Sequence, residues 1–275
     1  MLIEQAFHNL PEILLGAGYS RQEYSQGFEA SIVSAFSLAI LQELNGRNAP
    51  NPISFLMAEK RYSELRRNIR ADLHVNLSKL FTGSENYAKF GFRFSNWIEA
   101  KYFRKTKGSC PYTQNRGLVV ADLIRLIGLI PREEKDGVTR TGRYFLHVYQ
   151  GNPLSYLHSS VKTDPPKRKW VEQILSNGYQ SISDLELGKE KQSFFTHFPK
   201  GLANANISLD VTNYKLNQLQ DQDNSPYTLI LTRIESAKII WGDKILTLTE
   251  DRKLECNEFE KFRNVLSEEL KPQKD

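Results

Sequence analysis

The segment SNWIEAKYF, residues 95–103, places two charged side chains in the middle of an apolar and aromatic run. Alternation of this kind is typical of a β-strand, in which every second side chain leaves the same face. Glu99 and Lys101 therefore share one face, and the residues between and beside them pack behind. Charged groups on a buried strand cost free energy unless they meet partners or a metal ion. This strand thus has to lie beside other polar groups in the fold.

A second alternating segment, ADLHVNL, precedes the first along the chain. Its leucines and valine point one way, while Asp72, His74 and Asn76 point the other. If the two strands pair, the carboxylates of Asp72 and Glu99 can meet at one edge and hold a hard divalent cation through oxygen ligands.

The other elements expected up to residue 151 complete a mixed α/β layer fold. Apolar residues at steps of three and four predict a helix over 21–44. A second helical segment is predicted over 52–67, opened by Pro52. Aromatic alternation from Phe90 extends the strand at Glu99 as one bent strand or two consecutive ones. A helix over 118–130, ended by Pro131, and a strand over 142–151 follow.

The Pro- and Lys-rich segment HSSVKTDPPKRKW, residues 158–170, predicts a boundary. We expect a unit over 1–157 and an α+β extension over 158–275, either separate or part of the same domain. In the extension we predict a short helix, two strands, a returning hairpin and a final helix, over residues 170–177, 206–216, 227–241, 244–249 and 257–270. No motif assigns its role, which we expect to be DNA reading or dimer contacts.

Composition excludes several classes of protein. With 275 residues, 40% hydrophobic and 25% charged, the chain can bury a core as one large domain or two smaller ones. Cys110 and Cys256 form no CxxC pair, which speaks against a disulfide framework or structural zinc and favours a reducing cytoplasm. No apolar stretch is long enough to span a bilayer, so we expect no membrane association. No phosphate-binding loop, nucleophile elbow or HExxH motif occurs.

The formal charge of +5 is compatible with a polyanionic partner but does not require one. Its distribution is more informative, because basic residues both lead into and leave the two strands. They could form a track for phosphates or simply a solvated face. The residues are Arg61, Arg66, Arg67 and Arg70 before the first strand, and Lys101, Arg104, Lys105 and Lys107 at the end of the second.

The pattern of an acidic residue on one strand and (D/E)-x-K on the next resembles the PD-(D/E)xK nuclease superfamily. Here it reads D72-L-H-V and I98-E-A-K101-Y-F, over a region of about residues 20–150. The helix and strand that follow Lys101 also match the αβββαβ order of that family. Ala71 stands where the family often has proline, which is not a ligand. The resemblance implies a restriction-endonuclease-like mixed β-sheet flanked by helices.

The resemblance also implies roles for residues. Asp72, Glu99 and Lys101 would be catalytic, with Asp72 and Glu99 binding Mg²⁺, or Mn²⁺ in its place. A glutamate on the helix before the first strand often lies near the metal, and Glu29 is the first candidate, followed by Glu59. Arg104, Lys105 and His74 are predicted to contact nucleic acid. Asp122 and Arg125 are interpreted as an intrahelical pair.

From these residues we predict a metal-dependent endonuclease of double-stranded DNA, typical of restriction or anti-phage defence. Its expected partners are DNA, a second copy of the chain as a homodimer, and a protein of a defence system. Two alternatives stay open. Besides the simpler interpretation of the three residues as edge-strand charges, one is an inactive nucleic-acid- or partner-binding protein that keeps the same fold with a dead site. The other is a partner-activated RNase or toxin effector.

Overall fold

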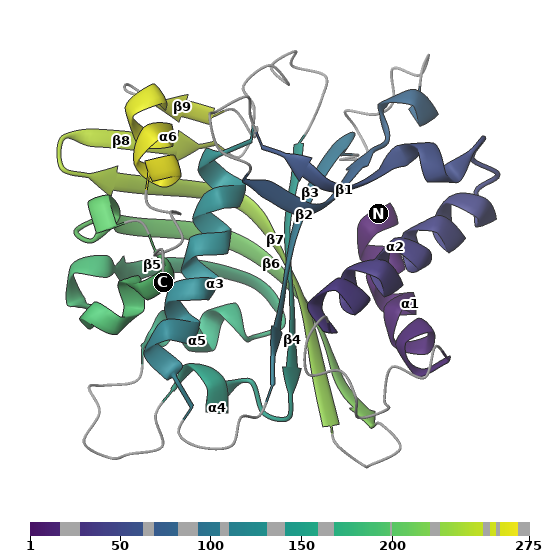
Figure 1. The fold of residues 1–275 in the computed structure, drawn as a ribbon, viewed down its shortest axis with the longest axis horizontal. Helices are drawn as coiled ribbons and strands as arrows, with labels where there is room; N and C mark the ends of the chain where they lie inside the picture. Colours follow the sequence, from purple (N-terminus) through teal and green to yellow (C-terminus); the bar gives the residue numbers. More distant parts are fainter. Residues whose placement is uncertain are drawn as a thin grey trace, which may run out of the picture.

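In a computed structural model, the chain folds around one large mixed β-sheet with helices on both faces (Figure 1). The structure describes residues 1–16, 28–62, 69–81, 93–104, 110–130, 141–158, 168–198, 200–220, 226–249, 254–256 and 259–268. The helices are α1 (Leu2–Gly16), α2 (Phe28–Gly46), α3 (Tyr112–Gly128), α4 (Leu154–Leu157), α5 (Lys169–Ile174) and α6 (Phe259–Glu268). The strands are β1 (Leu56–Arg61), β2 (Arg70–Asn76), β3 (Ser95–Phe103), β4 (Thr141–Gln150), β5 (Gly178–Glu186), β6 (Asn206–Gln220), β7 (Pro226–Trp241), β8 (Lys244–Leu248) and β9 (Leu254–Cys256).

The sheet runs in the order β1-β2-β3-β4-β7-β6-β5, with β8 beside β7 and β9 beside β8. Strand β2 is antiparallel to both β1 and β3, whereas β3 and β4 are parallel. Helix α3 connects these two parallel strands, as parallel pairs require a crossover. The C-terminal strands join the same sheet, because β7 pairs with β4. The sheet is therefore continuous across the boundary expected near residue 158.

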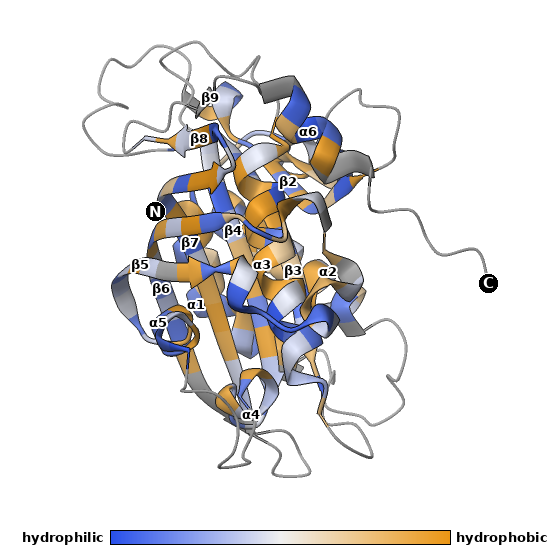
Figure 2. Ribbon diagram, turned by 90° about the vertical axis from the view of Figure 1, so that its left-hand side faces the viewer, coloured by the Kyte–Doolittle hydropathy of each residue, from blue (hydrophilic) through white to orange (hydrophobic). Residues whose placement is uncertain are grey.

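Two hydrophobic cores lie on opposite faces of the sheet. Helices α1 and α2 cover one face, where Ile98 of β3 and Leu146 of β4 are buried. Helix α3 covers the other face, where Trp97 and Phe103 of β3 are buried together with Phe145 of β4. The alternation of β3 read from the sequence thus separates two cores. Figure 2 shows that the central strands and the helices packed on them are rich in hydrophobic residues. Glu99 and Lys101 belong to the α3 face.

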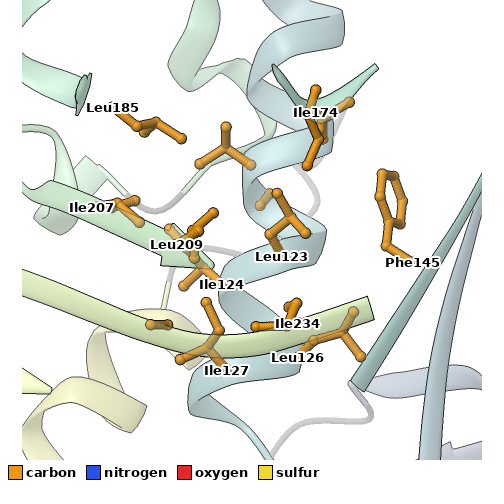
Figure 3. Packing of buried hydrophobic residues seen from close by; sticks show 14 of the residues in the cluster. Leu123, Ile124, Leu126, Ile127, Phe145, Ile174, Leu185, Ile207, Leu209 and Ile234 are labelled. Atoms are coloured by element: carbon orange, nitrogen blue, oxygen red, sulfur yellow. The ribbon is translucent and has the colours of Figure 1, made fainter. Parts of the chain in front are cut away.

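Helix α3 packs through a broad apolar stripe. Its residues Leu123, Ile124, Leu126 and Ile127 are buried and point toward side chains of the neighbouring strands and of α5 (Figure 3). These include Phe145, Ile174, Ile207, Leu209 and Ile234. The stripe fixes the rotation of α3 about its axis, and so determines which polar residues of α3 face β3.

The elements expected from the sequence are mostly present. Strands β2, β3 and β4, helix α3, and the C-terminal elements α5, β6, β7, β8 and α6 are confirmed with shifted ends. The predicted helix over 21–44 is confirmed from Phe28, and residues 17–27 lie outside the described ones. The strand expected from Phe90 is confirmed from Ser95, and residues 82–92 lie outside the described ones. Helix α1 and strand β5 were not predicted.

The helix predicted over 52–67 is wrong over 52–62, and residues 63–67 lie outside the described ones. A four-residue 3₁₀ helix, Pro52–Phe55, is followed by strand β1. The backbone enters this segment through Asn51 and passes through Glu59 with positive φ angles of 49° and 50°, which no α-helix contains. Most of β1 is exposed, so its sequence lacks an apolar face, and its pairing with β2 decides its structure.

No helix within the described residues is long and apolar enough to cross a membrane.

Gly117 of α3 has no room for a side chain. A Cβ atom there would lie 2.0 Å from the backbone oxygen of Phe194, which cannot move as a flexible side chain could. We expect Gly117→Ala to lower the free energy of unfolding by about 1–3 kcal/mol through overpacking, measured by chemical denaturation. Gly46→Ala is the control, because nothing lies within 4 Å of its Cβ position. An unchanged stability of Gly117→Ala would show that α3 does not pack so closely.

Candidate functional site

Strands β2 and β3 separate at the candidate site. Their pairing runs from Asn76↔Ser95 to Leu73↔Ile98, and beyond it β2 continues alongside β1. Beyond Ile98, the edge of β3 that faces β2 is therefore not paired with that strand, and two carboxylates occupy it. Asp72 Oδ2 accepts a hydrogen bond of 2.6 Å from the Ala100 amide, and Glu29 Oε2 accepts one of 3.4 Å from the Tyr102 amide. The two acidic side chains thus reach β3 from β2 and from the first turn of α2.

Glu99 lies beside them and is buried, with 4% of its surface exposed. Its Oε1 accepts a hydrogen bond of 2.6 Å from the Tyr62 hydroxyl. Burial raises the pKa of Glu99 well above its ordinary value, and the carboxylates of Asp122 and Asp72 raise it further. The site therefore disfavours negative charge on Glu99 unless a cation is near.

Lys101 supplies a positive charge two residues further along β3. Its Nζ lies 3.1 Å from Glu29 Oε1, so a glutamate of α2 and a lysine of β3 form an ion pair at the sheet edge. Burial acts to lower the pKa of Lys101, but the carboxylates of Asp122 and Glu29 raise it overall. Burial also raises the pKa of Glu29, although Lys101 opposes this effect. Lys101 is therefore protonated at neutral pH.

Helix α3 adds two residues to the site. Arg125 donates a hydrogen bond of 2.6 Å to Asp122 Oδ1, which confirms the predicted intrahelical pair. The sequence did not place this pair at the site, although both residues affect the pKa of Glu99. Burial raises the pKa of Asp122, and Arg125 and Lys101 oppose the shift. In the sequence, the one indication was an acidic and a basic residue three positions apart beside the apolar residues of a helix.

We call Glu29, Asp72, Glu99 and Asp122 the carboxylate cluster. It brings four acidic groups together against two cations, Lys101 and Arg125. When all six are ionised the formal charge is −2, which one divalent cation would neutralise. In addition, Asp122 Oδ2 is buried and has no hydrogen-bond partner among the described residues. Both features fit a hard divalent ion with oxygen ligands.

The carboxylates are not arranged as a complete set of metal ligands. Within the described residues, no three His, Cys, Asp or Glu side chains are grouped so that they could hold a metal ion. Asp72 and Glu29 instead bond to β3 amides and to Lys101. Any metal would therefore bind to a smaller set of direct ligands, or bind with rearrangement of these side chains.

His74 is in the interior and not at the surface. Its ring is 3% exposed, its Nε2 lies 3.1 Å from Lys60 Nζ and 2.9 Å from Ser95 Oγ, and it packs against Trp97. Burial, followed by the charge of Lys60, lowers the pKa of His74 to about 3. The ring is therefore neutral and bonded to other residues of the protein. Because it is buried, His74 is not at the surface where contact with nucleic acid was predicted.

The other predicted residues fall into three groups. Arg61, Arg70 and Arg104 are exposed. Because β2 and β3 are antiparallel, the start of β2 and the end of β3 lie at the same end of the sheet as the carboxylate cluster. Glu59, the second candidate for the helical glutamate, is on β1 and pairs with Arg70 at 2.8 Å. Lys105, with Arg66, Arg67 and Lys107, lies outside the described residues.

The chain matches no protein-family model, no curated protein and no solved structure at a significant level.

Proposed function

We propose that the chain is a metal-dependent nuclease of the PD-(D/E)xK type. The observation that carries the proposal is the meeting of Asp72, Glu99 and Lys101 where β2 and β3 separate. The charge of Asp72 raises the pKa values of both Glu99 and Lys101, so the three side chains interact electrostatically in the fold.

The order of elements supports the same proposal. From α2 the chain continues through β1, β2, β3, α3 and β4, which is the αβββαβ order that the resemblance implies. We therefore propose that this part of the mixed sheet is the restriction-endonuclease-like core, with Glu29 on its first helix. Strands β5 to β9 enlarge the sheet beyond that core.

Each residue then has a defined task. Asp72 and Glu99 would hold Mg²⁺, which when bound activates water and neutralises charge on the phosphate. Lys101 is held at the sheet edge by Glu29 and keeps its proton, so it supplies a fixed positive charge to the phosphate. Tyr62 fixes one oxygen of Glu99 and leaves the other available. Glu29 is the acidic group best placed to leave its ion pair with Lys101 and bind the metal instead.

Double-stranded DNA is the proposed substrate. Arg61, Arg70 and Arg104 extend positive charge over the end of the sheet that carries the carboxylate cluster, which suits contacts to a phosphate backbone. Binding to DNA as a homodimer, a defence-system partner and a cytoplasmic location stay predictions.

Purified protein is expected to nick or cut supercoiled plasmid in Mg²⁺ and to be inactive in EDTA. Genomic DNA and total RNA, incubated in parallel, identify the nucleic acid that is cleaved. Asp72→Asn should lose the activity, whereas Glu59→Gln, which changes an exposed glutamate away from the cluster, should retain it. Cleavage that persists in EDTA, or in Asp72→Asn, would argue against this site.

One observation favours a second candidate, a partner-activated RNase or toxin effector. Lys101 is tied to Glu29, and the described carboxylates do not form a ready set of metal ligands. A partner that moved α2 would release Glu29 from β3. Protein that cleaves nothing alone but cleaves RNA after addition of a trigger would favour this candidate, and a chain that only binds would favour the inactive form.

A further inference from the structure

Asp122 is the one acidic residue of the carboxylate cluster that the sequence pattern did not assign to the metal. It lies on α3, which faces the side of β3 that carries Glu99 and Lys101. Its side chain is 3% exposed. The charge of Asp122 raises the pKa of both Glu99 and Lys101, and α3 packs against β3 on this face. Asp122 is therefore close to both residues even though it bonds to neither.

The two oxygens of Asp122 have different environments. Oδ1 accepts the hydrogen bond from Arg125, which fixes the orientation of the carboxylate. Oδ2 is buried and has no partner among the described residues. A buried carboxylate oxygen without a hydrogen bond is energetically unfavourable, so such an atom is expected to meet a ligand or a bound water.

We infer that Asp122 is a third acidic residue of the divalent-cation site, and that its Oδ2 accepts a hydrogen bond from a water molecule on the ion. Mg²⁺ retains several waters when protein carboxylates bind it, and these waters need acceptors. Contact through water is consistent with the lack of three grouped direct ligands in the described residues. Arg125 is then a positioning residue, because it holds Asp122 with one oxygen free. The inference rests on the proposed function.

The test measures metal affinity and not cleavage. Titration calorimetry with Mn²⁺ gives the dissociation constant of the full chain and of Asp122→Asn. We expect about a tenfold weaker affinity in the variant, the lower range for loss of a group that bonds to metal ligands. In Asp122→Asn, the amide oxygen can still accept the hydrogen bond from Arg125. The NH₂ group then points toward the ion, where it cannot accept a hydrogen bond from a metal-bound water.

Glu190→Gln is the matched control. Glu190 is also 3% exposed and also pairs with an arginine of α3, Arg116, at 3.0 Å. Its loss removes the same charge and breaks buried ion pairs with Arg116 and, at 3.2 Å, with Arg168, but Glu190 is not part of the carboxylate cluster. We expect it to destabilise the fold and to leave the Mn²⁺ affinity within about twofold, since only Asp122 contacts the hydration shell.

A double variant, Asp122→Asn with Arg125→Gln, is used if the single variant does not fold. It replaces a buried ion pair with two neutral amides, which is much less destabilising than leaving one charge unpaired. It also keeps the formal charge of the cluster at −2, so weaker Mn²⁺ binding would come from the loss of Asp122 itself.

The outcomes separate the two proposals. Wild-type protein that binds no Mn²⁺ overturns the proposed function and this inference with it. Wild-type protein that binds Mn²⁺, loses it in Asp72→Asn and keeps it unchanged in Asp122→Asn overturns the role of Asp122 alone.

Discussion

Glu99→Gln is expected to reduce Mg²⁺-dependent cleavage by about 10³-fold or more, equivalent to about 4 kcal/mol of transition-state stabilisation. Glutamine has nearly the same shape and can still accept the hydrogen bond from Tyr62, so the fold should be retained. It cannot supply the negative charge that a divalent cation needs. Plasmid cleavage at saturating Mg²⁺, with Glu59→Gln as the control, measures the loss. Activity within tenfold of wild type would exclude Glu99 as a ligand.

The same substitution should stabilise the metal-free protein. Burial and the charges of Asp122 and Asp72 raise the pKa of Glu99, so the folded protein binds this proton more tightly than the unfolded chain does. Stability is therefore lost as pH rises from the ordinary pKa of glutamate toward the raised folded value. We expect the melting temperature of Glu99→Gln, in EDTA at pH 7, to be about 2 °C higher than that of the wild-type protein. The melting temperature of the variant should also depend less on pH. Glu186→Gln, at an exposed pair, should show the wild-type dependence.

Trp97→Ala is expected to have the largest effect on stability, a loss of about 3–5 kcal/mol in the free energy of unfolding. Trp97 is fully buried, stacks on Tyr62 with ring centroids 5.2 Å apart, and packs against His74. Lys60 Nζ also lies 4.5 Å from its ring. Removal of the indole leaves a cavity beneath the tyrosine that holds Glu99. Urea denaturation measures the loss.

Trp97→Phe is the matched control for that variant. It keeps an aromatic ring for Tyr62 and removes an indole N–H that has no partner among the described residues. We expect it to cost about 1–2 kcal/mol, less than half the effect of alanine. Equal costs for the two variants would mean that the ring kept by phenylalanine contributes nothing to stability, and that features present only in the indole dominate at this position.

The sequence predicted the strands of the site because their apolar residues alternate. Strands β2 and β3 each place residues in two cores, so Leu73 and Ile98 mark one face and Trp97 the other. Strand β1 could not be predicted in this way. It is an edge strand with Met57 exposed, and its structure depends on pairing with β2.

The parts of the site that the sequence left unassigned depend on contacts between distant residues. Tyr62 and Glu99 are 37 positions apart, and nothing in either local pattern indicates their hydrogen bond. Asp122 and Arg125 were recognised as a pair, but their place beside Glu99 follows from how the apolar stripe of α3 packs on the sheet. Helix rotation of this kind is a property of the folded core, and a three-residue spacing cannot reveal it.

The most direct test of the metal site is a crystal structure of the protein soaked in Mn²⁺, examined by anomalous scattering. The proposal predicts one anomalous peak at about 2.0–2.6 Å from carboxylate oxygens of both Asp72 and Glu99. It also predicts that the peak disappears in Glu99→Gln crystals treated in the same way. A wild-type crystal with both carboxylates ordered and no peak between them would contradict the proposed nuclease site.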